Sequence, residues 1–228
     1  MNLPSASSTK TAASRILVWD APVRVFHWLL VLCFSVAYLT AESEPWEQVH
    51  VTAGYTLAGL VVFRLLWGVV GSYHAQFRHF LRGPAAVLGY LRSLWRREPQ
   101  HYTGHNPAGA VAILLLLGLG AALSVSGWAM DVERGGEAVE ELHEVLANLM
   151  LGVVLVHLAG VISGSLLHHE NLVRAMVTGY KSGAAAEAIA GSRRWVAVLL
   201  LVAVLVFWWL QWQGGSAFVE ELHHTGIE

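Results

Sequence analysis

Apolar residues occur in five long runs along the chain, separated by polar or charged stretches of different lengths. A helix needs about 20 apolar residues to cross a hydrocarbon core about 30 Å thick, and the runs have about that length. The pattern therefore predicts an all-α integral membrane protein with five transmembrane helices. The predicted spans are 22–40, 48–70, 107–130, 140–168 and 195–212.

Basic and acidic stretches alternate between these spans. Arg and Lys precede the first span and follow the second and the fourth, whereas acidic residues follow the first and the third. Because cytoplasmic loops carry the excess of Arg and Lys, we expect the N-terminus in the cytoplasm and the C-terminus in the periplasm. The acidic residues expected outside are Glu42, Glu44, Glu47, Asp131, Glu133, Glu137, Glu140 and Glu141.

The segments between and beyond the spans have compositions of their own. Residues 1–14 are small and polar, which predicts a disordered cytoplasmic tail. The stretch of about 79–97 alternates Leu with Arg at helical spacing, which favours an interfacial helix on the lipid surface over an ordinary loop helix packed on the spans. Residues 182–194 read as a flexible linker and residues 213–228 as an extracytoplasmic tail.

Composition limits the chemistry that this bundle can carry. The chain is 55% hydrophobic and 13% charged, as expected of a membrane protein. Its one cysteine, Cys33, excludes an internal disulfide, a covalent haem site of the Cys-x-x-Cys-His type and a four-cysteine iron–sulfur cluster. There are 12 histidines, so imidazole is the obvious ligand for a redox cofactor.

Two of these histidines lie in the fourth span, fourteen positions apart, at His143 and His157. That separation advances a helix by about 21 Å and returns to within about 40° of the same face. Loop charges then place His143 on the outer side and His157 on the inner side. His50, at the start of the second span, is also outer, and His27, near the start of the first, is also inner.

Each level therefore has two imidazoles from different helices, the ligand set of a haem with two axial histidines. We expect two haem b groups, with His50 and His143 binding the outer iron and His27 and His157 the inner iron. A lone histidine in a membrane is as often an interhelical hydrogen-bond donor as a ligand, so the prediction depends on the pairing. Small residues beside the ligands leave room for a flat macrocycle, namely Gly54, Gly160 and Gly164.

Arg64 is a second ionisable residue inside a predicted span, at the inner level. It suits a haem propionate, because Arg binds carboxylates in a bidentate fork. Contact with a quinone carbonyl and simple snorkelling to the headgroups remain open. The other eight histidines read mostly as solvated interface groups; they are His74, His79, His101, His105, His168, His169, His223 and His224.

Several motifs resemble the bacterial cytochrome b561 family, which includes the cytochrome b subunits of nickel–iron hydrogenases. The second span ends in the family's Arg-Leu-x-Trp-Gly pattern from Arg64, and the histidine pair is followed by Glu170-Asn171-Leu172. The first span opens with the family's characteristic residues, here Trp19, Asp20, Pro22, Arg24, Phe26, His27 and Trp28.

The resemblance covers residues 15–181 and implies a haem-binding four-helix domain in the bacterial inner membrane. It implies the same four histidines as iron ligands, and electron exchange with quinone or a redox partner. The fifth span departs from the minimal bundle of the family.

Three functions fit these observations to different degrees. We favour an electron-transfer subunit, rather than a stand-alone enzyme, that relays electrons across the membrane between the quinone pool and a c-type cytochrome or dehydrogenase. The alternative is a self-contained oxidoreductase that moves electrons from a small molecule such as superoxide to quinone, but the acidic outer loops disfavour an anionic substrate. A metal transporter is disfavoured because the histidines do not converge at the midplane. We expect no nucleic-acid partner.

Overall fold

The computed structural model describes residues 14–225 apart from 97 and 99, with side chains as far as Gly214. Within this part of the chain, five helices are long and apolar enough to cross a membrane. They are α1 (Ala21–Thr40), α2 (Glu47–Val70), α5 (Pro107–Asp131), α6 (Gly136–Leu167) and α8 (Arg194–Thr225). The five predicted spans and the helical membrane class are thereby confirmed.

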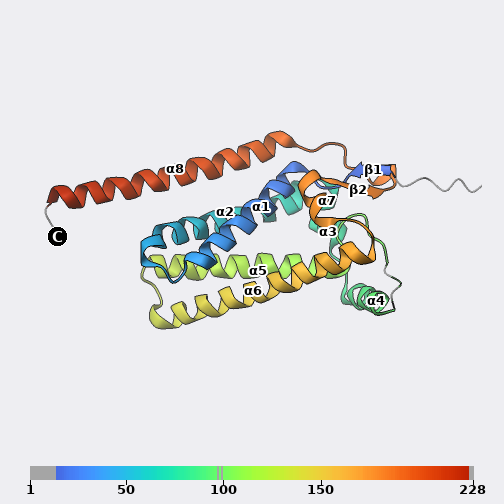
Figure 1. Ribbon diagram of the computed structural model, residues 1–228, viewed down its shortest axis with the longest axis horizontal. Coiled ribbons are helices and arrows are strands. Elements are labelled where there is room, and N and C mark those ends of the chain that lie inside the picture. Colours follow the sequence, from blue (N-terminus) through green and yellow to red (C-terminus); the bar gives the residue numbers. More distant parts are fainter. Residues whose placement is uncertain (1–13, 97, 99, 226–228) are drawn as a thin grey trace, which may run out of the picture.

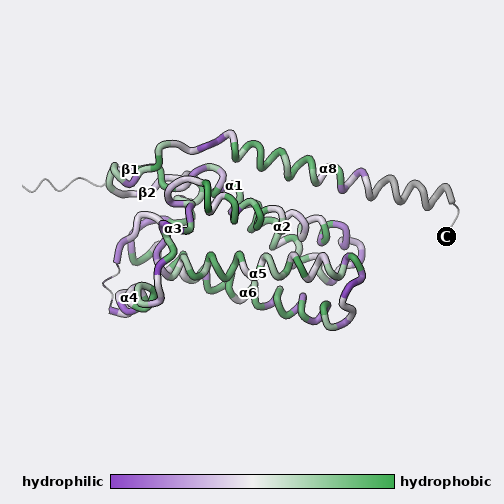
Figure 2. The backbone as a smooth tube through the Cα atoms, turned by 180° about the vertical axis from the view of Figure 1, so that it is seen from behind, coloured by the Kyte–Doolittle hydropathy of each residue, from purple (hydrophilic) through white to green (hydrophobic). Residues whose placement is uncertain are grey.

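Four of these helices form a bundle in which sequence neighbours pack side by side, α1 on α2, α2 on α5 and α5 on α6 (Figure 1). The fifth helix, α8, lies against α1 on the side away from α6. Apolar residues cover the middle of the long helices, while polar residues gather toward the helix ends (Figure 2). The bundle core is made by Phe26, Cys33, Ala53, Leu57, Leu60, Val61 and Leu117.

Local sequence explains where the helices begin and how closely they pack. Asp20 caps α1 by accepting a hydrogen bond from the Val23 amide at 2.8 Å, and Asn106 caps α5 in the same way. A proline in the first turn of each helix suits its fixed φ angle. Gly120 brings α5 close to α2, since an added Cβ would lie 3.2 Å from Val61.

The bundle has two unlike ends. The His50 end contains the start of α2, the start of α6 and the short helix η1 (Glu44–Trp46). The Arg64 end contains the end of α2 and several additional short elements (Figure 1). These are η2 (Tyr73–Ala75), α3 (Phe77–Phe80), α4 (Pro84–Trp95), α7 (Leu172–Thr178) and η3 (Ala185–Glu187).

A two-stranded antiparallel sheet completes the Arg64 end and joins distant parts of the chain. Strand β1 (Ser14–Leu17) pairs with β2 (Tyr180–Gly183), with Ser14 opposite Gly183 and Leu17 opposite Tyr180. Gly179 precedes β2 with φ +88°, and its carbonyl accepts hydrogen bonds from the Val18 and Trp19 amides. A side chain at Gly179 would place its Cβ 2.6 Å from the Trp19 carbonyl oxygen, so only glycine fits this crossing.

Three boundaries differ from those predicted. The interfacial helix expected over 79–97 is broken into α3 and α4, because Pro84 starts a new helix and cannot continue the previous one. The expected linker 182–194 contains the end of β2 and η3. The fifth helix does not end at residue 212 but continues to Thr225, through most of the predicted tail. The tail predicted over 1–14 lies outside the described residues except for Ser14, which begins β1.

Candidate functional site

The structure brings His50 of α2 and His143 of α6 together at one end of the bundle. Their ring centroids are 6.2 Å apart, with the planes inclined by 67°. His50 Nδ1 lies 2.8 Å from the Ala37 carbonyl oxygen, which can only accept, so His50 Nδ1 must donate. The proton of His50 is therefore on Nδ1, and Nε2 carries the lone pair that a metal requires.

His143 is held in the same way by α5. Its Nδ1 lies 2.8 Å from Ser126 Oγ, and that hydroxyl donates to the Leu123 carbonyl at 3.2 Å. Because the single hydroxyl proton is used, His143 Nδ1 donates to the serine oxygen and Nε2 is again free to bind a metal. Gly127 makes room for the ring, since an added Cβ would lie 3.2 Å from His143 Cε1.

The second predicted pair, His27 of α1 and His157 of α6, lies toward the Arg64 end. The two imidazoles are close enough for their charges to interact. Both rings are partly buried, and His27 Nδ1 is buried without a hydrogen-bond partner among the described residues. The Trp28 ring meets His27 edge-on at 5.1 Å. This pair therefore differs from the first, because the protein does not hold the Nδ1 atom of His27.

Arg64 is buried at the end of α2, with only 3% of its surface exposed. Its guanidinium carbon lies 4.8 Å from the Phe77 ring centroid and 5.9 Å from that of Phe80, in cation–π contact. Its Nη1 has no hydrogen-bond partner among the described residues. The sequence also left open that Arg64 extends to the lipid headgroups. A guanidinium buried in this way does not reach them, so that interpretation is wrong.

Two histidines at the Arg64 end are placed differently from the sequence prediction. His105 and His74 were expected to be solvated, but His105 packs between the Trp19 ring at 4.5 Å and the Phe80 ring at 4.6 Å. Burial, and next the charge of Arg64, lower the pKa of His105 to about 3. His74 is 8% exposed, with Nε2 2.8 Å from the Glu187 carbonyl oxygen.

These contacts depend on segments distant in sequence, so no local motif around either histidine predicts them. His101, by contrast, is exposed as expected and lies edge-on to His168, with ring centroids 5.1 Å apart. Residues 223 and 224, the other histidine pair of the prediction, lie beyond the described side chains.

The glycines expected beside the ligands divide into two groups. At Gly54 and Gly160 an added Cβ would meet nothing within 4 Å, which leaves open space next to His50 and His157 along their helices. At Gly164 an added Cβ would lie 3.2 Å from Leu172, so this glycine packs against α7 and its predicted role beside a macrocycle is not supported.

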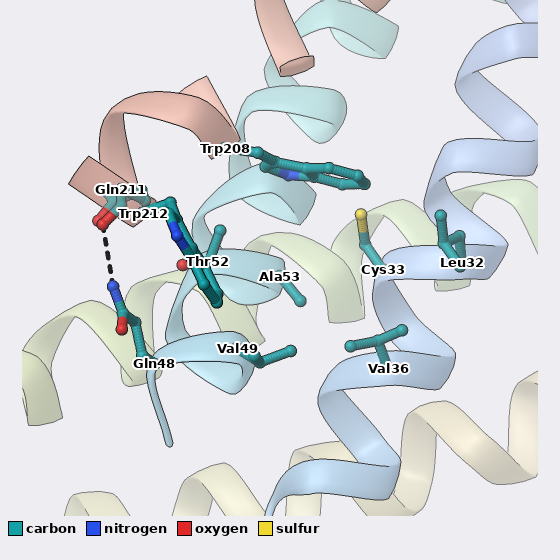
Figure 3. A pocket seen from close by; sticks show the side chains of 10 residues that line it. All are labelled: Leu32, Cys33, Val36, Gln48, Val49, Thr52, Ala53, Trp208, Gln211 and Trp212. Carbon is teal, nitrogen blue, oxygen red and sulfur yellow. Dashed lines mark hydrogen bonds between the residues drawn. The ribbon is translucent and has the colours of Figure 1, made fainter. Parts of the chain in front are cut away.

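An apolar pocket of about 340 Å³ lies on the other side of α2, between α1 and α8 (Figure 3). Cys33 and the Trp208 ring face each other across it. The Gln48 amide donates to the Gln211 carbonyl at 2.9 Å at its edge, and Trp208 Nε1 donates to Thr56 Oγ1 at 2.8 Å. These two hydrogen bonds attach α8 to α2.

Histidine pairs of this kind, contributed by different helices of a membrane bundle, are typical of membrane b-type cytochromes. Comparison with known proteins agrees. A model of the prokaryotic cytochrome b561 family matches residues 18–179, and the chain belongs to that family. It is therefore a multi-pass haem b protein of electron transport. The matched residues include all four paired histidines and Arg64, whereas α8 lies outside them.

Curated relatives are hydrogenase-associated. A probable Ni/Fe-hydrogenase B-type cytochrome subunit of Azotobacter vinelandii is 24% identical over 213 residues, covering 73% of this chain and 88% of the relative. The corresponding protein of Rhodobacter capsulatus is 21% identical, with 73% and 81% covered. The hydrogenase 1 subunit of Escherichia coli K12 is also 21% identical, with 72% and 90% covered. No solved structure matches the chain.

Proposed function

We propose that this protein is a di-haem electron relay, with His50 and His143 binding one iron and His27 and His157 the other. The observation that carries the proposal is the arrangement of four imidazoles in two pairs on α1, α2 and α6. When bound, a b-type haem accepts and releases one electron through its iron. The protein supplies the ligands, their orientation and the surrounding apolar bundle.

The donor set fits this cofactor. A haem iron with two axial histidines needs a neutral imidazole on each face, with the lone pair on the coordinating nitrogen. Hydrogen bonds from Nδ1 to Ala37 and Ser126 select that tautomer at His50 and His143. The open space beside Gly54 and Gly160 is consistent with a flat group close to the backbone.

We further propose that the His50 end faces the periplasm and the Arg64 end the cytoplasm of a bacterial inner membrane. This orientation follows from the excess of Arg and Lys in the segments at the Arg64 end. It would place the N-terminus in the cytoplasm and the end of α8 in the periplasm. In α4, Leu88, Leu91 and Trp95 are exposed, as an interfacial helix on the cytoplasmic lipid surface requires.

The names of the relatives suggest a hydrogenase as the redox partner, and this is the dehydrogenase class that we propose at the His50 end. Acidic side chains at this end, among them Glu44, Glu137 and Glu141, are exposed and offer a negatively charged docking surface. We propose quinone as the partner at the Arg64 end. A c-type cytochrome is the alternative partner of the acidic surface. The same negative charge disfavours superoxide as an electron donor.

A spectrum of the purified protein tests the proposal. The reduced-minus-oxidised difference spectrum should contain two b-type α-bands, and a haem assay should give two haems per chain. One haem per chain would contradict the two-level arrangement, and the absence of a b-type band would overturn the proposal altogether. Reoxidation of the reduced haems by a quinone, and their reduction by a hydrogenase with hydrogen, would then identify the two partners.

A further inference from the structure

The Arg64 end contains more buried positive charge than the described residues neutralise. Arg64 is 3% exposed and its Nη1 has no hydrogen-bond partner among the described residues. In the same part of the chain, the one ion pair described joins Lys181 to Glu170 at 3.2 Å, so it does not involve Arg64. A buried cation that lacks a partner is strongly unfavourable.

Asp20 is a candidate for the counter-charge of Arg64, but it has other roles. Its carboxylate is fully buried and accepts hydrogen bonds from the Val23 amide at 2.8 Å and from Trp67 Nε1 at 3.0 Å. Its charge acts on both Arg24 and Arg64. One carboxylate shared by two guanidinium groups, and in ion-pair distance of neither, leaves a surplus of positive charge.

His105 places a second unused polar atom in the same region. Its ring is sandwiched between Trp19 and Phe80, and Phe80 is also a ring on which the Arg64 guanidinium lies. The buried Nδ1 of His105 has no hydrogen-bond partner among the described residues. The charges of Arg64 and His157 both act on this imidazole.

We infer that Arg64 and His105 together form a binding site for an anionic group, a carboxylate or phosphate, at the Arg64 end of the bundle. Arg64 supplies the charge and Nη1 as donor, and His105 supplies Nδ1–H as a second donor while its ring remains neutral. The inference deepens the proposed function, on which it rests where the anion is a haem propionate. A phospholipid phosphate is the other source of the same chemistry at this depth.

A quinone carbonyl fits the site less well. It can accept one hydrogen bond from Arg64, but it is neutral and leaves the buried charge without compensation. An anion satisfies both the charge and the donors. The charge of the ligand therefore distinguishes the two partners that the sequence left open for Arg64, a propionate and a quinone, and it favours the propionate. The site also includes His105, which was predicted from the sequence to be solvated.

The test uses the full-length purified protein and variants at both positions. Arg64→Gln removes the charge and His105→Phe removes the donor with a ring of similar shape. His105→Gln restores an amide donor and is the conservative variant. Arg82→Gln is the matched control. The Arg82 guanidinium also lies on an aromatic ring, 4.7 Å from the Tyr102 centroid, but Arg82 is exposed. Retention of the α-band of the haem at His50 and His143 verifies that each variant is folded.

Two readouts distinguish the sources of the anion. Redox-difference infrared spectra are recorded with haem labelled with ¹³C in its propionate carboxylates, and tightly bound phospholipid is counted by phosphorus analysis. If the anion is a propionate, Arg64→Gln and His105→Phe shift the labelled carboxylate band. They also lower the midpoint potential of the haem at His27 and His157 and leave that of the other haem unchanged. His105→Gln restores the band. For a lipid phosphate, the same variants lose bound phospholipid and leave the labelled band unchanged.

The inference is overturned if both variants leave the labelled band, the midpoint potentials and the bound phospholipid equal to those of Arg82→Gln. It is equally overturned if only Arg64→Gln has an effect, because His105 then takes no part in the site. A protein that binds no haem would refute the proposed function alone, and the phospholipid count would still decide whether an anion is held at Arg64 and His105.

Discussion

The two ends of the bundle hold their histidines by different means. At the His50 end, Ala37 and Ser126 fix the Nδ1 atoms of both rings, so each imidazole has one tautomer and one orientation. At the Arg64 end, no described residue hydrogen-bonds to the buried His27 Nδ1, Arg64 Nη1 or His105 Nδ1 atoms. At one end the chain itself fixes the imidazoles, whereas at the other end buried polar atoms lack partners among the described residues.

This contrast indicates which interactions fold the protein and which bind its cofactors. A ligand held by hydrogen bonds from neighbouring helices is positioned before the metal arrives. Buried polar atoms without partners cost free energy that the apo protein must bear. We therefore expect the His50 end to be organised without its cofactor and the Arg64 end to gain most of its order when its ligands bind.

Loss of an axial ligand should have the largest effect and separates the two ends. His143→Leu should abolish the haem at the His50 end and His157→Leu the haem at the Arg64 end, so each variant retains one of the two α-bands and one haem per chain. Difference spectra and a haem assay measure this. The control His101→Leu changes an exposed histidine and should keep both haems. If His143→Leu and His157→Leu remove the same band, the pairing by level is wrong.

Removal of the Ser126 hydroxyl tests the fixed tautomer at the His50 end. Ser126→Ala should weaken haem binding there about 10- to 100-fold, the usual cost of losing the hydrogen bond behind a metal-binding histidine. Haem titration into the apo protein measures it. Ser124→Ala is the matched control, because that hydroxyl donates to the Gly120 carbonyl on the same helix. Equal affinities for the two variants would show that Ser126 does not orient His143.

The sequence predicted most of the fold because the membrane imposes simple rules. Spans follow from apolar length, and the five helices begin and end within a few residues of prediction, except the end of α8 and the start of α6. The pairing of His50 with His143 was predictable as well, because helical periodicity and loop charge both constrain it. The pairing of His27 with His157 as iron ligands stays a prediction.

The remaining parts of the site depend on contacts that periodicity does not encode. His105 is partly exposed, but its Nδ1 atom is buried, because Trp19 and Phe80, both distant in sequence, pack against the ring. Ser126 became a partner of His143 through the packing of α5 on α6, and a lone serine in an apolar run gives no sign of this. The sheet of β1 and β2 was missed because each strand is four residues long.

Mild acid should destabilise the protein through His105 when neither haem nor bound phospholipid occupies the Arg64 end. His105 has a folded-state pKa of about 3, lowered mainly by burial, against about 6.5 when unfolded. Its neutral form therefore stabilises the fold fully above pH 6.5, and stability is lost as the pH falls from 6.5 toward 3. Between pH 7.5 and 5.5 the free energy of unfolding should fall by about 1 to 1.5 kcal/mol from this residue.

Detergent-solubilised protein, prepared without haem and depleted of phospholipid, is unfolded with denaturant at several pH values to test this dependence. His105→Gln has no titrating ring and should show a smaller loss on acidification than the unaltered protein. The loss of stability that remains in His105→Gln includes a contribution from His168. Burial and the charge of His101 lower the pKa of His168 as well, so this contribution has the same sign. An identical pH dependence in the two proteins would show that His105 is not a buried neutral group.

The smallest effect is expected where α8 joins the bundle, on the face of α2 away from the paired histidines. Trp208→Phe keeps an aromatic ring against the pocket but removes the hydrogen bond to Thr56, and hydrogen bonds between membrane helices average about 0.6 kcal/mol.

Cys33 reports on this contact, because it is 1% exposed beneath α8 and is the only cysteine of the chain. Its rate of modification by a maleimide should rise two- to threefold in Trp208→Phe, the factor that corresponds to about 0.6 kcal/mol. Trp209→Phe, at an exposed neighbouring ring, should leave the rate unchanged, and equal rates in both variants would show that α8 is held by apolar packing alone.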